Sequence, residues 1–129
     1  MPRKSKGKVI VVEDSEFIRE AIVNSLAAHG FAVASAEDGQ AAYELICSSS
    51  ETYFALIADL DMPRMCGDEL IEALDKSAVK FSAYVVISAH TEDHPAIAQL
   101  RARRFEVPLF FLPKPFETQE LAQLLDSIP

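Results

Sequence analysis

Short apolar segments alternate along this chain with segments whose apolar residues recur at helical spacing. The apolar segments cover residues 9–12, 31–36, 54–58, 84–87 and 107–112. Most of them are β-branched or aromatic without a regular polar side, which is typical of strands buried on both faces. This pattern constrains the fold more than any other feature, because such strands need cover from two sides.

The segments between these strands predict helices. Gly30 predicts the end of the first helix, and Pro95 is expected in the first turn of the fourth. Strands that alternate with helices predict an α/β fold, a doubly wound parallel sheet with helices on both faces and right-handed crossovers. The predicted helices contain Ile18, Ala21, Ile22 and Leu26; residues 40–47; Leu70, Ile71 and Leu74; about 93–104; and Leu121, Leu124, Leu125 and Ile128, the last with Thr118 as its cap.

Length and composition predict one soluble domain. The 129 residues are 50% hydrophobic and 25% charged, which is ordinary for a single globular unit. The net charge of −8 argues against a protein built to bind the phosphate backbone of nucleic acid. No apolar run has the length of a membrane span, and two cysteines favour free thiols in the cytoplasm. Residues 1–8 are interpreted as a basic tail and residues 9–129 as the domain.

Residues with useful chemistry follow four of the predicted strands. In an open α/β sheet, the carboxyl ends of parallel strands share one edge, where ligands bind. The sequence therefore predicts a cluster of carboxylates, one hydroxyl and one ammonium group at that edge. Its members are Glu13 and Asp14 after the first strand, Asp59 and Asp61 after the third, Ser88 after the fourth and Lys114 after the fifth.

This mixture of groups points to phosphoryl transfer. Crowded carboxylates repel one another, and a hard divalent cation such as Mg²⁺ relieves that repulsion. A lysine and a hydroxyl in the same cluster are useful when an anion shares the site. An aspartate can then act as the nucleophile that receives the phosphoryl group. Each residue alone could be a turn or cap residue, but their joint occurrence in the expected loops favours a site.

Four motifs extend this interpretation to a known family. They are Val-Ile-Val-Val-Glu-Asp-Ser at 9–15, Leu-Ile-Ala-Asp-Leu-Asp-Met-Pro-Arg-Met-Cys-Gly at 56–67, Val-Ile-Ser-Ala at 86–89 and Phe-Leu-Pro-Lys-Pro-Phe at 111–116. In this order, the motifs resemble those of a response-regulator receiver domain, the phosphoacceptor module of two-component signalling. The resemblance covers residues 8–128, and it implies a flavodoxin-like sheet with strand order 2-1-3-4-5.

The resemblance also implies a role for each residue of the cluster. Asp59 is expected to be the phosphoacceptor. Asp14, Asp59 and the backbone carbonyl of Asp61 are expected to bind Mg²⁺, with Glu13 holding the metal through water. Lys114, before a cis bond to Pro115, is expected to pair with the phosphoryl oxygens. Ser88 and Phe111 are expected to move together as the switch, with the output face on the fourth helix, fifth strand and fifth helix.

The implied partners follow from this role. We expect a histidine kinase or a histidine phosphotransfer protein as donor, and a downstream protein or a further output domain as recipient. Neither nucleic acid nor membrane is an expected direct partner, and a dimer formed on phosphorylation remains an open expectation. The protein would be a signalling switch rather than an enzyme, catalysing only its own phosphorylation and dephosphorylation. Two arrangements stay open: a single-domain regulator of the chemotaxis type, or the N-terminal receiver of a longer protein.

Several residues depart from the usual receiver pattern. Cys66 stands where many receivers carry aspartate, and Phe111 lacks the hydroxyl of the commoner tyrosine. Asp61 and His90 face the expected route of an attacking water and should set the lifetime of the phosphoryl group. The stretch from residue 88 to 114 is longer than usual. The basic group of Arg101, Arg103 and Arg104 is either a solvated helix end or a docking patch for an acidic partner.

Two other functions remain as alternatives. A phosphatase of the haloacid-dehalogenase type would use Asp59 and Asp61 as nucleophile and acid/base, with Ser88 and a later lysine. That family places its metal-binding acidic pair late in the chain, whereas Glu13 and Asp14 come early, and it needs a longer chain. A degenerate receiver that serves only for docking is the other alternative, although all the switch residues are present.

Overall fold

The sheet has the predicted architecture. The computed structural model describes residues 7–49, 52–62, 64–89, 94–103, 105 and 107–128. The strands are β1 (Lys8–Val12), β2 (Ala32–Ala36), β3 (Tyr53–Asp59), β4 (Ala83–Ser88) and β5 (Leu109–Pro113). They form one five-stranded sheet in the order β2-β1-β3-β4-β5, and every neighbouring pair is parallel. The α/β fold and the strand order 2-1-3-4-5 are therefore confirmed.

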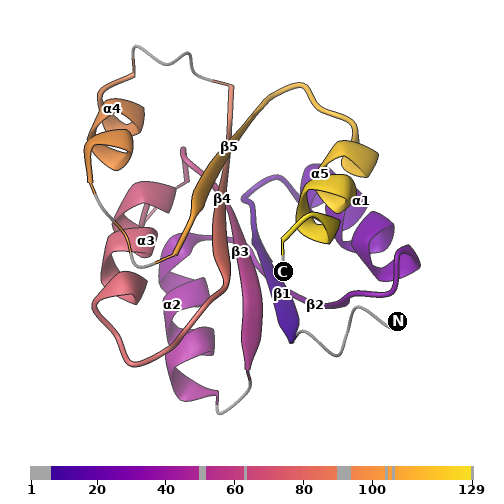
Figure 1. Cartoon of the computed structure of the whole chain (residues 1–129), viewed down its shortest axis with the longest axis horizontal. Helices are drawn as coiled ribbons and strands as arrows, with labels where there is room; N and C mark the ends of the chain where they lie inside the picture. Colours follow the sequence, from indigo (N-terminus) through magenta and orange to yellow (C-terminus); the bar gives the residue numbers. More distant parts are fainter. Residues whose placement is uncertain are drawn as a thin grey trace.

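In the described part of the chain, five helices cover the two faces of the sheet. They are α1 (Glu16–Ala28), α2 (Gly39–Ser48), α3 (Gly67–Asp75), α4 (Pro95–Ala102) and α5 (Thr118–Asp126). Helices α2, α3 and α4 lie on one side of the sheet and α1 and α5 on the other (Figure 1). The central strands β1, β3 and β4 are buried as the sequence predicts, whereas the edge strands β2 and β5 are mostly half-buried.

Alternation along each strand divides the core into two halves. Ile10 and Val12 of β1 point to the side of α2, α3 and α4, whereas Val9 and Val11 point to the side of α1 and α5. All four side chains are fully buried. Between their first and last residues, the three central strands therefore carry no charged side chain; Lys8 begins β1, and Asp59 and Ser88 end β3 and β4.

Some predicted element boundaries need correction. The fifth strand begins at Leu109 rather than at residue 107, and it extends to Pro113. Thr118 is the first helical residue of α5 and not its cap. The cap is Glu117, whose backbone N–H donates to the carboxylate of Glu120 in a capping box.

Two predicted helix signals are confirmed. Gly30 follows the cap of α1 with φ +94°, which favours glycine, and Pro95 is the first residue of α4. Helix α4 covers Pro95–Ala102, a shorter range than the predicted 93–104, whose two end residues lie outside the described part. Within the described ranges, no helix combines the length and the apolar character needed to cross a membrane.

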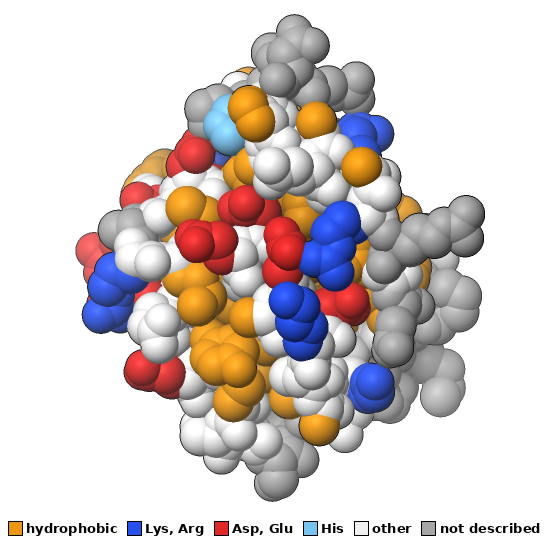
Figure 2. Space-filling model, turned by 90° about the vertical axis from the view of Figure 1, so that its left-hand side faces the viewer, with side chains coloured by type: hydrophobic (Ala, Val, Ile, Leu, Met, Phe, Trp, Pro, Cys, Tyr) orange, Lys and Arg blue, Asp and Glu red, His pale blue; other side chains and the backbone are white. Residues whose placement is uncertain are grey.

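The side of the molecule formed by α2, α3 and α4 carries a mixed surface. Acidic and basic side chains lie among hydrophobic ones on this face (Figure 2). Helix α4 carries the basic residue Arg101 in its last turn and is capped by Arg103. Several acidic side chains gather near the centre of this view, with basic side chains beside them (Figure 2).

Candidate functional site

The predicted functional residues meet at the carboxyl edge of the sheet. Asp59 is the last residue of β3, and the register places it beside Ile87 of β4. Ser88 follows as the last residue of β4 and lies beside Pro113 of β5. The Lys114 backbone N–H donates to the Ser88 carbonyl oxygen at 2.8 Å. Strand pairing alone therefore brings the third, fourth and fifth strand ends together.

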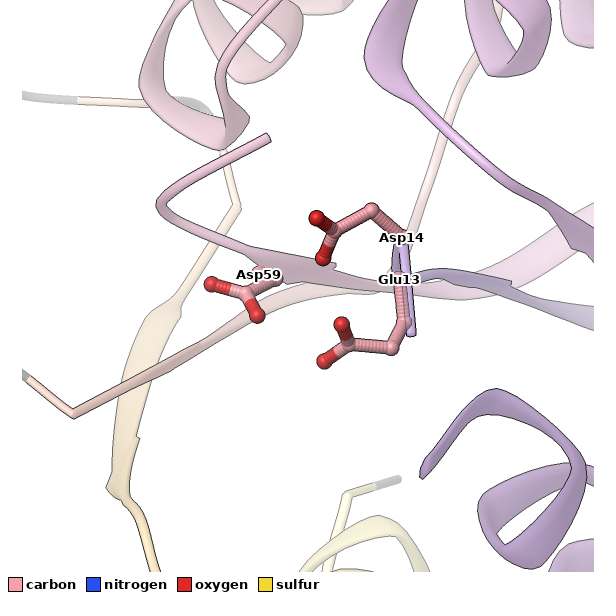
Figure 3. A group of neighbouring side chains, drawn as sticks. All are labelled: Glu13, Asp14 and Asp59. Atoms are coloured by element: carbon pink, nitrogen blue, oxygen red, sulfur yellow. The ribbon is translucent and has the colours of Figure 1, made fainter. Parts of the chain in front are cut away.

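Three carboxylates form the centre of this edge. Glu13, Asp14 and Asp59 each offer a carboxylate oxygen, and these oxygens lie within 4.8 Å of one another. The side chains come from the end of β1 and the end of β3 and face a common space (Figure 3). Glu13 and Asp59 are buried, with residue exposures of 1% and 4%, whereas Asp14 is exposed. The cluster is therefore open to solvent on the Asp14 side.

Lys114 joins two of these carboxylates. Its Nζ donates to Oδ2 of Asp59 at 2.5 Å and to Oε1 of Glu13 at 3.0 Å. The lysine side chain is itself only 21% exposed. A cation from the end of β5 thus compensates part of the negative charge gathered at the ends of β1 and β3.

Backbone N–H groups hold the remaining carboxylate oxygens. The Asp61 N–H donates to Oδ1 of Asp59 at 2.9 Å, and the Ser15 N–H donates to Oε2 of Glu13 at 3.0 Å. Arg19 of α1 donates from Nη1 to the Glu13 carbonyl oxygen at 2.8 Å. Each oxygen of Asp59 therefore has a donor, and the carboxylate is held in one orientation.

The crowding of charge changes the pKa values in the cluster. Burial, together with the hydrogen-bonding contact to Asp59, raises the pKa of Glu13 from 4.5 to about 7, although the Ser15 N–H and Lys114 oppose this. Burial acts to lower the pKa of Lys114, but its hydrogen bonds to Asp59 and Glu13 outweigh this effect and raise the pKa. The lysine is therefore charged at neutral pH, and the acidic cluster has an excess of negative charge.

The donor set fits a hard divalent cation. All the side-chain donors of the cluster are carboxylate oxygens, which Mg²⁺ prefers. The raised pKa of Glu13 shows that burial beside other carboxylates disfavours its ionised form, a cost that a nearby cation would reduce. Asp14 leaves one side open, which suits an ion that retains several waters.

The predicted switch residues lie on neighbouring strands. Ser88 is buried at the end of β4, and Phe111 of β5 lies beside Val86 of β4. The Phe111 ring is half-buried and packs on the side of the sheet that α3 and α4 cover. The guanidinium of Arg101 lies 4.5 Å from the centre of that ring. Phe111 is therefore covered by an arginine of α4, which the sequence alone did not indicate.

Gly67 explains part of the Met-Pro-containing motif. It begins α3, and a Cβ atom added there would lie 2.5 Å from the Asp59 carbonyl oxygen. Only glycine therefore lets α3 start this close to the backbone of Asp59. Cys66 precedes it as the cap of α3, and its N–H donates to Glu69 at 3.0 Å. The cysteine thus occupies a structural position beside the site.

One ion pair next to the site was not predicted. Asp38 precedes α2, and Arg64 follows β3 in the loop that leads to α3. Arg64 donates from Nε to Oδ2 of Asp38 at 2.9 Å and from Nη2 to Oδ1 at 3.1 Å. The sequence does not single out Asp38, because nothing in it reveals which distant residues contact each other.

Several predicted residues fall outside the described part. His90, expected to affect the phosphoryl lifetime, is one of them, as are Arg104 and residues 1–6 of the basic tail. Lys8, the last residue of that predicted tail, is the first residue of β1. The Lys114–Pro115 peptide bond is cis, as predicted.

Comparison with known proteins decides the family. A family model described as "Response regulator receiver domain" matches residues 9–126. The chain belongs to this family. Receiver domains are the phosphoacceptor modules of two-component signalling, and the family binds Mg²⁺ at an acidic pocket. At the carboxyl edge of its sheet, this receiver domain has an acidic cluster of Glu13, Asp14 and Asp59.

Curated relatives of this receiver domain include longer response regulators. Response regulator MprA of Mycolicibacterium vanbaalenii is 32% identical over 114 residues, which cover 88% of this chain and 46% of that protein. The MprA of Mycobacterium ulcerans is 33% identical, with the same coverage. The chain thus spans about half the length of the curated relatives it matches.

Solved structures of receiver domains share the same fold. The chemotaxis protein CheY4 of Vibrio cholerae superposes with a TM-score of 0.78 at 27% identity, covering 95% of this chain and 98% of that one. A CheY-like receiver domain from Methylobacillus flagellatus gives a TM-score of 0.75 at 25% identity, with the same coverage. The receiver fold therefore extends over nearly the whole chain.

Proposed function

We propose that Asp59 accepts a phosphoryl group from a phosphohistidine and that this changes the α4-β5-α5 face for partner binding. The observation that carries the proposal is the geometry of Asp59. Its buried carboxylate lies within reach of two further carboxylates, and its oxygens are held by Lys114 and by the Asp61 N–H. An oriented nucleophile beside a cation and a metal-binding acidic cluster is the arrangement that phosphoryl transfer needs.

Each side chain has a distinct part in the transfer. A carboxylate oxygen of Asp59 forms a bond to phosphorus while the bond from phosphorus to the histidine nitrogen breaks, and the imidazole leaves. Lys114 exchanges its contact with Asp59 for one with a phosphoryl oxygen and stabilises the negative charge. The Asp61 N–H holds the carboxylate oriented during attack.

Mg²⁺ is part of this proposal. Asp14, Asp59 and the backbone carbonyl of Asp61 would bind the ion, with Glu13 reaching it through water. When bound, the ion neutralises charge on the phosphoryl oxygens. Support comes from the three carboxylates, because they present only oxygen donors and leave one side open to solvent.

The switch follows from the position of Ser88. We assign its hydroxyl to the phosphoryl group after transfer, because β4 ends next to the end of β3. We assign to Phe111, on the neighbouring strand β5, an inward turn that accompanies the movement of Ser88. The phosphoryl group thus biases a two-state equilibrium that is read on α4, β5 and α5.

The donor approaches beside α1. An apolar groove there is lined by side chains of α1 and of the segment that follows β5, and Lys114 forms part of its wall. Phe17 stands at its edge and is 84% exposed. Because this groove opens next to Lys114, we assign it to the histidine kinase or phosphotransfer protein, whose histidine must reach Asp59. We also propose that a downstream protein or output domain binds the α4-β5-α5 face, and that a dimer can form there on phosphorylation.

The protein is proposed to be a cytoplasmic switch that catalyses only its own phosphorylation and dephosphorylation. We assign control of the lifetime of the phosphoryl group on Asp59 to Asp61 and His90. Cys47 and Cys66 are free thiols, which fits a reducing compartment. The early position of Glu13 and Asp14 and the match to receiver domains weigh against a haloacid-dehalogenase-type phosphatase.

The direct test is the intact mass of the protein after incubation with acetyl phosphate and Mg²⁺. We expect one phosphoryl group on the natural chain. We expect none on Asp59→Asn, which keeps the shape of the side chain but loses the nucleophilic oxygen, and none in EDTA. If no adduct forms with acetyl phosphate or with a histidine-phosphorylated donor, the protein is a docking module that is not phosphorylated.

A second assay separates the phosphatase alternative. A receiver turns over only its own phosphoryl group, so a set of small phosphate monoesters should stay intact over many hours. Multiple turnovers of any of them, lost in Asp59→Asn, would replace the proposed switch with an enzyme. The natural chain and Asp59→Asn thus serve in both the mass measurement and the monoester assay.

A further inference from the structure

The loop between β3 and α3 is tied to α2 by an ion pair. Arg64 contacts both carboxylate oxygens of Asp38, with Nε to Oδ2 at 2.9 Å, Nη2 to Oδ1 at 3.1 Å and Nη2 to Oδ2 at 2.8 Å. The Asp38 side chain is only 7% exposed, whereas that of Arg64 is 59% exposed. A two-pronged contact to a buried carboxylate is geometrically defined, unlike most surface ion pairs.

Asp38 is in turn fixed to α2. Its Oδ1 accepts from the Ala41 N–H at 2.8 Å, which caps the helix. The next residue, Gly39, lies against the same loop, because an added Cβ would be 2.1 Å from the Met65 carbonyl oxygen. The start of α2 and the loop therefore touch at two places, one polar and one at the backbone.

The loop carries a residue that the metal site needs. Asp61 belongs to it, and its N–H donates to Asp59 at 2.9 Å, while its carbonyl is the expected backbone ligand. The Leu60 N–H donates to the Ile87 carbonyl oxygen at 3.0 Å and the Gly67 N–H to the Leu60 carbonyl oxygen at 3.2 Å. These backbone bonds lie near the ends of the loop, whereas the ion pair of Arg64 with Asp38 ties its middle to the start of α2.

We propose that Arg64 is a positioning residue for the metal site. By holding the loop against α2 through Asp38, it keeps the Asp61 backbone carbonyl at the place where Mg²⁺ binds. It touches neither the ion nor the phosphoryl group. The inference rests on the proposed function, because it assumes that this acidic pocket takes Mg²⁺.

For Arg64→Gln, a positioning role and a simple charge effect predict opposite changes in Mg²⁺ affinity. Arg64→Gln removes a positive charge from the loop that follows Asp59, so charge alone would tighten Mg²⁺ binding. Asp38→Asn removes a negative charge, so charge alone would weaken it. If the pair acts by holding the loop, both variants weaken binding. Asparagine still caps a helix, and glutamine keeps the same backbone constraints at Arg64, where φ is +70°.

The experiment is a calorimetric Mg²⁺ titration of the unphosphorylated full chain. We expect each single variant to raise the dissociation constant about 10-fold, the low end for residues that hold metal ligands. The double variant should be no weaker than the singles, because both changes break one contact. Arg103→Gln is the matched control: it removes an arginine that pairs with Glu72 on α3, and it should leave the constant unchanged.

Four outcomes would overturn the inference. These are a tighter constant for Arg64→Gln, additive losses in the double variant, an equal loss in Arg103→Gln, or unchanged constants in both single variants while their melting temperatures fall. The last result would assign the pair to stability alone. Failure of the natural chain to bind Mg²⁺ would instead count against the proposed function, so the two failures are distinguishable.

Discussion

At the scale of single residues, the site depends on how charge is compensated. Glu13 and Asp59 are buried side by side, and Lys114 contacts both. One ammonium group does not balance the carboxylates around it, so the pKa of Glu13 rises to about 7 through burial and the proximity of Asp59. The same excess of negative charge that favours a cation therefore makes Glu13 sensitive to pH.

The pH dependence of stability follows from this pKa. The folded state holds the Glu13 proton more tightly than the unfolded chain, whose pKa is near 4.5. The stabilisation of the folded state by protonated Glu13 is therefore fully present below the unfolded pKa of 4.5, and it is lost as the pH rises through about 7. In EDTA, we expect the melting temperature of the natural chain to fall over this pH range by roughly 4 °C or more beyond any fall in Glu13→Gln.

Thermal melts at a series of pH values check this expectation. Adding Mg²⁺ should reduce the difference between the natural chain and Glu13→Gln, because the cation favours ionised carboxylates. Melting curves that stay parallel across the pH series in EDTA would show that Glu13 does not titrate in this way.

At the scale of elements, α3 is placed by the absence of a side chain at Gly67. A Cβ there would lie 2.5 Å from the Asp59 carbonyl oxygen and 3.1 Å from its carbonyl carbon. Gly67→Ala must therefore displace either the helix or the backbone of the proposed phosphoacceptor. We expect a loss of about 2 kcal/mol in the free energy of unfolding and a fall of roughly 10-fold or more in the phosphorylation rate.

Gly30→Ala is the matched control for this prediction. It also replaces a glycine beside a helix end, and φ of +94° makes alanine strained there. It should lower the melting temperature but leave the phosphorylation rate of the folded protein unchanged. Equal losses of rate in both variants would mean that the Gly67 effect is only one of stability.

Most helices and strands could be predicted from the sequence, because buried strands appear in it as short apolar runs. The same strand ends gave Glu13, Asp59 and Lys114, since parallel strands deliver their following residues to one edge. The start of β5 was missed because Val107 is apolar and packs on the core although it precedes the strand. Thr118 is a good cap by type, but Glu117 and Glu120 form the reciprocal pair.

Contacts between distant residues set the limit of prediction from sequence. The pair of Arg64 with Asp38 joins positions 26 apart, and Arg101 covers Phe111 because α4 packs over β5. No periodicity marks such partners, since packing of the whole fold decides them. The sequence could name the chemistry of the site but not the residues that support it from other elements.

At the scale of the whole molecule, Arg101 links the proposed output face to Phe111, the proposed switch residue. Its guanidinium lies 4.5 Å from the centre of the Phe111 ring, a contact worth about 0.5–1 kcal/mol at an exposed position. The proposed inward movement of Phe111 would break this contact. Arg101→Ala should therefore raise the population of the inward state in the unphosphorylated protein about 2- to 5-fold.

NMR spectra of the aromatic side chains measure this population. In Arg101→Ala, the Phe111 signals should move part of the way toward their phosphorylated positions. Arg103→Ala is the control, because that arginine lies over Phe105, 5.0 Å from the ring centre, and not over Phe111. Unmoved Phe111 signals in Arg101→Ala, or equal movement in both variants, would mean that the arginine does not restrain the switch.

The measurement that most directly tests the account is chemical identification of the phosphorylated residue. Borohydride reduces an aspartyl phosphate to homoserine, and peptide mass mapping then locates that residue. The pocket offers several carboxylates, but Asp59 alone is oriented by both Lys114 and the Asp61 N–H. We predict homoserine at position 59 after incubation with a phosphodonor and Mg²⁺, and none in EDTA. Homoserine at Asp14 or Asp61 instead would contradict the account.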